Sequence, residues 1–214
     1  MVYHAIMADP SAAPMASLAE RKRQLVRDEL AEAAVKILAW RGFEDTTVEQ
    51  IADAVGVSRR TFFRYFPSKE DAVVHVLSVA GTQLCAELRA RPGGEPPAVA
   101  LRHALSPFIQ YCGGDPDKTL RISRLILNTP ALLGHFLERQ ARWQADITSI
   151  LAQRTGLDPH ADLRPALAAG VALTAFNVAL HRWADSGGSE DLAELIDQAF
   201  SVIAPALDFS AGAS

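Results

Sequence analysis

Apolar residues recur at spacings of three and four along most of the chain, and this period predicts helices. In the segment 17–41, for example, Val26, Leu30, Ala33 and Ile37 keep that spacing. The pattern resumes after a Pro- and Gly-rich break at 91–98, where we expect a loop. No alternating pattern of any length indicates a strand, so the sequence predicts an all-α fold. The expected helices span residues 17–41, 48–55, 59–66, 69–89, 99–111, 118–127, 130–155, 161–185 and 190–207.

Capping residues indicate where the two shortest of these helices begin. Thr47 and Gln50, three positions apart, form a capping box at the start of the first. Gly56 ends that helix, and Ser58 is suited to cap the next one. A short helix, a three-residue turn and a second short helix form the helix-turn-helix arrangement.

The second short helix has two different faces within the stretch GVSRRTFFRYFPSKE. Phe62 and Phe66 are four positions apart and share an inner, aromatic face. Arg59, Arg60 and Phe63 lie on the outer side. A guanidinium can bind guanine through two hydrogen bonds, and an apolar ring can contact the thymine methyl group. The pattern therefore indicates a DNA-binding helix, and the alternative is a charged face that meets only solvent.

Composition and charge change this interpretation little. The 214 residues are 49% hydrophobic, enough for a sizeable core, and the net charge of −4 argues neither for nor against nucleic acid. Cys85 and Cys112 have no metal-binding or redox spacing, which favours two core thiols in a reducing compartment.

Signals for catalysis, secretion and membrane insertion are absent from the sequence. It contains no nucleophile elbow, HExxH, phosphate loop or GxGxxG, so we expect no enzyme, no metal and no cofactor. The start lacks the pattern of a signal peptide. The longest nearly apolar run, 165–180, is shorter than the roughly 20 residues of a membrane helix, which predicts a cytoplasmic protein with no membrane partner.

The stretch GFEDTTVEQIADAVGVSRRTFFRYFPSKEDAV resembles the DNA-binding signature of the TetR family of transcriptional regulators, and the likeness covers about Arg21 to Leu77. The resemblance implies a homodimer that binds a palindromic double-stranded DNA operator. Arg59, Arg60 and Phe63 would then contact bases. The full set that it implies for DNA binding is Thr47, Ser58, Arg59, Arg60, Thr61, Phe63, Arg64, Tyr65 and Lys69.

These observations predict a division of the chain into four parts. Residues 1–16 are expected to be a disordered arm, 17–68 the DNA-binding domain, 69–208 an effector-binding and dimerisation domain, and 209–214 a flexible tail. Met1, Met7 and Met15 are three possible starts of translation.

The last two predicted helices differ from the others because they are rich in small residues and apolar on more than one side. Ser189 is expected to cap the final one. The TetR resemblance favours a dimer interface in which these helices form a four-helix bundle with their copies, and the alternative is a core within one chain. The residues assigned to this interface are Ala166, Ala169, Gly170, Leu173, Leu195, Ala199 and Val202.

The segment from Arg121 to Gly170 also resembles the C-terminal domain of a TetR subgroup named for mycofactocin regulators, which implies acyl-coenzyme-A-like effectors. Arg121 and Arg124 would then pair with an anionic head group, and the alternative is that they form contacts within the chain. Candidate ligand contacts on otherwise apolar faces are His103, Phe108, Tyr111, Arg121, Arg124, Asn128, Phe136, Trp143, Phe176, Asn177 and His181.

Together these features predict a repressor that a small apolar or acyl-type effector releases from its operator. The sequence leaves three alternatives open. The protein could be an activator or a regulator without an effector, it could be an all-α ligand-binding protein without a DNA function, or its aromatic and arginine face could bind another protein.

Overall fold

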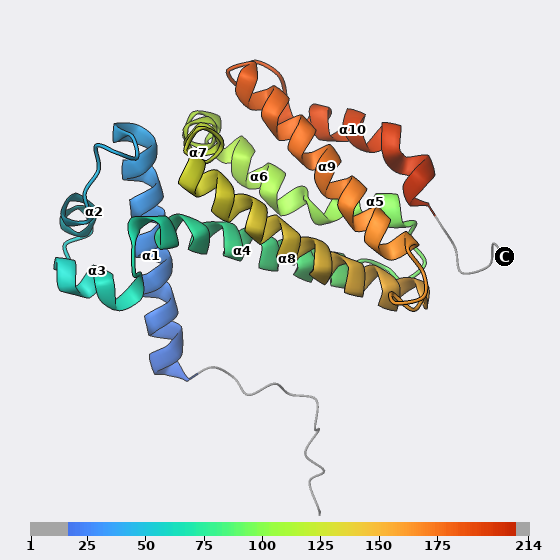
Figure 1. The fold of residues 1–214 in the computed structure, drawn as a ribbon, viewed down its shortest axis with the longest axis horizontal. Helices are drawn as coiled ribbons and strands as arrows, with labels where there is room; N and C mark the ends of the chain where they lie inside the picture. The colour runs from blue at the N-terminus through green and yellow to red at the C-terminus, as the bar shows by residue number, and fades with distance from the viewer. Residues whose placement is uncertain (1–16, 209–214) are drawn as a thin grey trace, which may run out of the picture.

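The computed structural model describes residues 17–208, which contain ten helices and no strand, as the all-α prediction requires (Figure 1). None of the helices in this described part has the length and apolar character needed to cross a membrane. The predicted disordered arm and flexible tail lie outside the described residues. The helices are α1 (Leu18–Arg41), α2 (Val48–Ala54), α3 (Arg59–Tyr65), α4 (Lys69–Ala90), α5 (Pro97–Ala104), α6 (Ser106–Gly114), α7 (Pro116–Asn128), α8 (Pro130–Thr155), α9 (Arg164–Asp185) and α10 (Leu192–Leu207).

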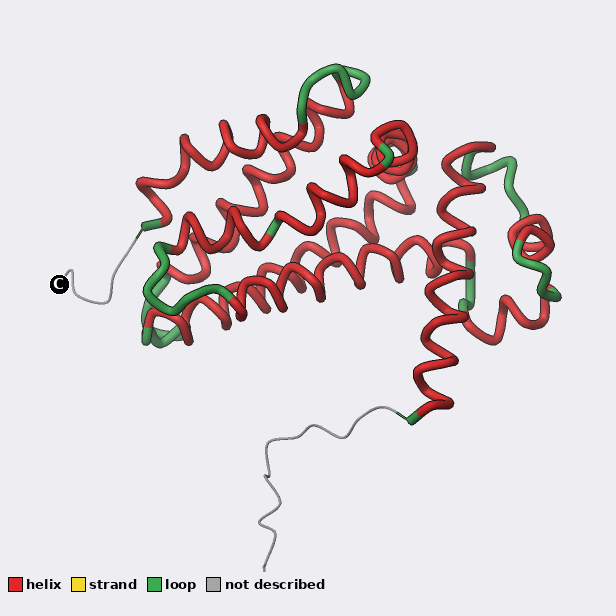
Figure 2. The backbone as a smooth tube through the Cα atoms, turned by 180° about the vertical axis from the view of Figure 1, so that it is seen from behind, coloured by secondary structure: helices red, strands yellow, loops and turns green. Residues whose placement is uncertain are grey.

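The first three helices form a unit at one end of the molecule, and α4 leads from this N-terminal unit into the larger helical body (Figures 1 and 2). Helix α4 packs against α1 in the unit and against α8 and α5 in the body, while α7 also contacts α1. Helices α9 and α10 lie together, and α9 also packs on α8. The N-terminal unit is therefore joined to the body by α4 and through the contact of α7 with α1.

The aromatic residues of α3 anchor the N-terminal unit. Phe62 and Phe66 are fully buried with Ile51 of α2 and Leu38 of α1, whereas Phe63 is 41% exposed. The inner and outer faces predicted from the spacing of these residues are confirmed. The predicted caps are also present: the Thr47 hydroxyl accepts from the Gln50 N–H at 3.3 Å.

Two expected details of the helical body were wrong. The helix predicted at 99–111 is divided into α5 and α6, because Pro107 has no amide hydrogen to donate to a carbonyl of the preceding turn. The last helix is capped by Asp191, whose carboxylate accepts from the Glu194 N–H at 3.0 Å, and not by Ser189. An aspartate and a serine cap equally well, so sequence alone gave no preference.

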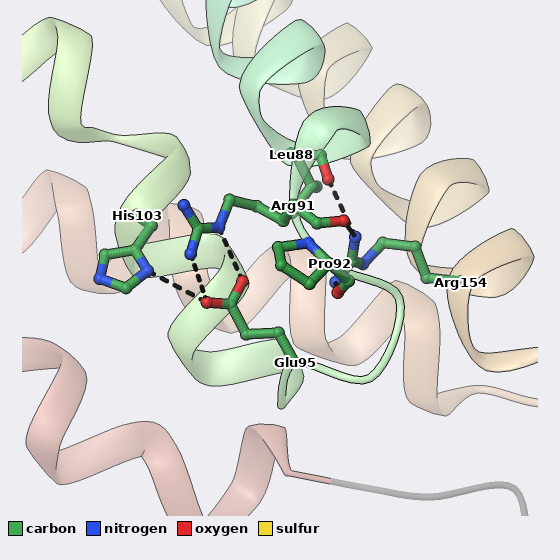
Figure 3. Close-up of polar contacts among 6 residues, drawn as sticks. All are labelled: Leu88, Arg91, Pro92, Glu95, His103 and Arg154. Atoms are coloured by element: carbon green, nitrogen blue, oxygen red, sulfur yellow. Dashed lines mark hydrogen bonds and ion pairs between the residues drawn. The ribbon is translucent and has the colours of Figure 1, made fainter.

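A polar network holds the C-terminal end of α4 against α8 (Figure 3). The Arg154 guanidinium, from α8, donates to the carbonyl oxygens of Leu88, Arg91 and Pro92 at 3.2, 2.7 and 2.8 Å. These are carbonyls at the end of α4 and just beyond it, where intrahelical donors run out. Arg91 in turn donates to Glu95 at 2.7 Å, and His103 lies 3.2 Å from the same carboxylate.

Glu95 is expected to make the free energy of unfolding depend on pH. The hydrogen bonds from Arg91, assisted by His103, lower the pKa of Glu95 from 4.5 to about 2, although burial opposes this shift. A carboxyl whose pKa is lower in the folded state stabilises the fold above its unfolded pKa and loses that contribution as the pH falls toward its folded pKa. The stability difference between wild type and Glu95→Gln should therefore shrink between about pH 5 and pH 3. Urea unfolding across this range measures it, and a constant difference would contradict the expectation.

Candidate nucleic-acid interface and ligand cavity

The outer face of α3 carries the exposed residues Arg59, Arg60, Phe63 and Arg64. Its local structure follows from Ser58, whose hydroxyl accepts from the Thr61 N–H at 3.1 Å and so fixes the first turn of the helix. With Phe62 buried beneath it, the helix cannot rotate without exposing a core ring. The face is therefore held in one orientation toward solvent.

The three arginines of this face have different surroundings. Arg59 lies 3.0 Å from the Glu49 carboxylate and 5.3 Å from the centre of the Phe63 ring. Arg64 lies 5.2 Å from the centre of the Tyr65 ring. Arg60 is exposed and contacts no other side chain of the described part of the chain through an ion pair, hydrogen bond or ring. Its guanidinium therefore offers all of its donors to an external acceptor.

The residues expected at phosphates are less available than those expected at bases. The Lys69 ammonium donates to the Phe43 carbonyl and, at 3.0 Å, to the Thr46 carbonyl, so it ties the turn after α1 to the start of α4. One of its three N–H groups remains for an external acceptor. Thr47 is exposed, but its hydroxyl caps α2, and Thr61 and Tyr65 are half-buried.

A cavity of about 370 Å³ lies between the helical body and α1, within the usual size of small-molecule sites. It follows the middle of α4 from Val73 to Leu84. Four of the expected ligand contacts line it: Phe108, Phe136, Trp143 and Phe176. They form two edge-to-face pairs, Phe108 with Phe176 at 5.1 Å and Phe136 with Trp143 at 6.2 Å between ring centres. The cavity is therefore largely aromatic on one side.

The polar candidates do not line this cavity. Arg121 lies 4.5 Å from the centre of the Trp40 ring, Arg124 donates to the Ala184 carbonyl at 3.0 Å, and Asn177 donates to the Gln140 side chain at 3.0 Å. These are contacts within the chain, and neither arginine lines the cavity. The pairing of the two arginines with an anionic head group therefore stays a prediction. The other candidates away from the cavity are Asn128, which is exposed, His103 beside Glu95, and His181 at the Asn177 carbonyl. The Tyr111 side chain lies outside the described part.

Sequence reasoning missed Gly81 of α4, which lines the cavity and lies against Trp143 of α8. A Cβ at Gly81 would lie 1.8 Å from Nε1 of Trp143, so the indole packs directly on the α4 backbone. The signal in the sequence was a glycine in the middle of a predicted helix, where it lowers helix stability unless packing requires it.

Asp28 and His75 were also missed, because they are 47 positions apart. His75 Nε2 lies 2.6 Å from the Asp28 carboxylate, and both residues line the cavity. The His75 ring is also 5.6 Å from the ring of Phe66, at the end of α3. One contact therefore separates the cavity from the core of the N-terminal unit.

The residues assigned to the dimer interface divide into two groups. Ala169, Leu173 and Leu195 are buried within the chain, so they do not lie on an accessible face. Ala166, Gly170 and Ala199 are partly exposed, and Val202 is 80% exposed. Large apolar side chains exposed on these two helices include Leu167 and Val178 of α9, both 61% exposed, besides Val202 of α10. Both helices are apolar on two sides, and periodicity does not tell which side faces the chain's own core.

Comparison with known proteins gives matches to both parts of the chain. Residues 30–76 match the family described as bacterial regulatory proteins, tetR family, and residues 95–208 match the MftR C-terminal domain. The chain is 34% identical to the HTH-type transcriptional regulator TcmR of Streptomyces glaucescens over 172 residues, 78% of this chain and 76% of that protein.

Two further relatives cover most of the chain. A protein described as a mycofactocin biosynthesis transcriptional regulator, MftR, of Mycobacterium tuberculosis is 30% identical over 206 residues, 91% of this chain and 98% of its own length. The structure of the FadR repressor of Thermus thermophilus in complex with lauroyl-CoA superposes with a TM-score of 0.56 at 24% identity, covering 88% of this chain and 98% of that one.

Proposed function

Because the chain belongs to the TetR family of transcriptional regulators, we propose that it is a cytoplasmic repressor whose α3 binds in the major groove of an operator. The observation that carries this proposal is the outer face of α3, where Arg60, which has no partner in the described part of the chain, is exposed together with Phe63. Arg60 can bind the O6 and N7 atoms of a guanine, and Phe63 can contact a thymine methyl group. Arg59 can also bind a guanine once its ion pair with Glu49 is broken.

The effector acts by binding the DNA-incompetent form more tightly than the competent one. Its site is the cavity beside the middle of α4. The N-terminal end of α4 is tied to the turn after α1 by Lys69, and its other end is held on α8 by Arg154. A ligand that displaces the middle of α4 therefore changes the position of the N-terminal unit, and with it the separation of the two α3 helices in a dimer.

Selection of bound fragments from sheared genomic DNA tests the function. The purified protein should recover fragments that share a two-fold symmetric site, with half-sites about one helical turn apart. The logarithm of the binding constant for that site should fall linearly with the logarithm of salt concentration, as phosphate contacts require. Recovery of random fragments at low salt only would contradict sequence-specific binding.

The proposed dimer interface is the surface of α9 and α10 that carries the exposed side chains of Leu167, Val178 and Val202. Val202→Glu should raise the dimer dissociation constant by about a hundredfold or more, because a two-fold axis places the unpaired carboxylate in the interface twice. Sedimentation at a series of concentrations measures this. Val99→Glu, which changes an exposed valine of α5, is the matched control and should leave the dimer intact. A Val202→Glu protein that remains dimeric would contradict the assignment.

A further inference from the structure

The cavity has no lysine or arginine among the described residues that line it. An anionic group transferred into it would lose hydration without gaining a cationic partner, which is unfavourable. The polar side chains that do line it are acidic, neutral or imidazole: Asp28, Glu32, His75, Gln83, Thr119 and Ser123.

The cations of α7 are absent from the cavity lining, and each contacts another group of the chain. Lys118 lies 3.1 Å from the Glu32 carboxylate, which Lys36 also approaches at 3.6 Å. Arg121 and Arg124 contact Trp40 and the Ala184 carbonyl, as described above. Among the described lining residues, a phosphate inside the cavity would therefore find the carboxylates of Asp28 and Glu32 and no lysine or arginine.

Ser123 and Gln83 are the polar lining residues without a hydrogen-bond or ion-pair partner in the described part of the chain, and of the two only Ser123 is buried. It is only 7% exposed, and its hydroxyl makes no hydrogen bond to any side chain or carbonyl of the described part. Thr119, one turn earlier on the same face of α7, differs because its hydroxyl donates to the Asp115 carbonyl at 3.0 Å. Buried hydroxyls are ordinarily hydrogen-bonded, so the Ser123 hydroxyl is available to a ligand.

We propose that the cavity selects an uncharged, mainly aromatic effector that hydrogen-bonds to Ser123, and that it excludes phosphate-bearing ligands such as acyl-coenzyme A. This inference rests on the proposed function only in taking the cavity as the effector site. The two edge-to-face aromatic pairs supply faces and edges for a ring, and Ser123 supplies one directional contact. The lauroyl-CoA bound by the Thermus thermophilus relative therefore belongs to a different ligand class.

Two dyes that differ by one sulfonate test this directly. Phenylnaphthylamine is uncharged, whereas anilinonaphthalene sulfonate carries one negative charge, and both fluoresce on entering an apolar site. Phenylnaphthylamine should bind at least about tenfold more tightly, because the described lining offers the sulfonate carboxylates and no lysine or arginine. Asp28→Asn should narrow the difference, since it removes one of those charges and keeps an acceptor for His75. Lauroyl-CoA should not displace phenylnaphthylamine.

Matched variants locate the dye. Ser123→Leu removes the hydroxyl and puts a branched apolar side chain in its place, so it should weaken binding about tenfold, while Ser149→Leu, on an exposed position of α8, should leave it unchanged. The inference would be overturned if the sulfonate dye binds equally or more tightly, or if lauroyl-CoA displaces phenylnaphthylamine. It would also be overturned if phenylnaphthylamine gives no saturable signal, or if Ser123→Leu leaves its binding unchanged. The titrations contain no DNA, so they remain informative if the operator selection fails.

Discussion

Arg60→Ala is expected to weaken binding to the selected operator by about 1–3 kcal/mol, or about 5- to 150-fold, and to relax the preference at one base position of each half-site. Arg60 is the arginine of α3 without a partner among the described residues, so removing it costs the free protein little. The loss should therefore appear in DNA binding and not in folding. Titration of a labelled operator at fixed salt measures it, with a thermal melt to verify the fold.

Arg60→Lys separates base recognition from charge. Lysine keeps the positive charge but lacks the rigid, planar pair of N–H donors of arginine, so the sequence preference should weaken while the salt dependence stays nearly the same. Arg89→Ala, an exposed arginine near the end of α4, is the charge-matched control. An Arg60→Ala protein with unchanged affinity and specificity would remove Arg60 from the base-contacting set.

Gly81→Ala is expected to destabilise the protein by about 1–3 kcal/mol, although alanine is the better helix former. The new Cβ would lie 1.8 Å from Trp143 Nε1 and 2.3 Å from its Cε2, so the buried indole would have to leave its place between α4 and the Phe136 ring. For a chain of this size the fall in Tm should be about 2–12 °C.

Gly134→Ala is the control for Gly81→Ala and is not expected to lower stability. Gly134 is also inside a helix, α8, but a Cβ there meets nothing within 4 Å. Its replacement should leave stability unchanged or raise it by up to about 1 kcal/mol. Trp143→Phe should relieve part of the Gly81→Ala loss, with a coupling of about 0.5–3 kcal/mol in a double-mutant cycle. Equal effects of the two glycine replacements would contradict the packing argument.

The sequence by itself determined the features that depend on near neighbours in the chain. The helical period gave the all-α fold, and the capping boxes and glycine turns placed α2 and α3 to within a residue or two. The four-residue spacing of Phe62 and Phe66 separated the core face of α3 from its outer face. These features are local because a helix places residues three and four apart on the same side whatever the rest of the chain does.

Only the tertiary structure decided which partners distant residues have. Arg121 and Arg124 looked suited to an anionic ligand, but Trp40 and the Ala184 carbonyl occupy them. Lys69 holds the turn after α1, and Ser123 lies in the cavity without a partner. A helix with two apolar sides does not specify which side meets its own core, and a polar side chain does not specify its acceptor. Both are set by helices that are far apart in sequence and come together only when the chain folds.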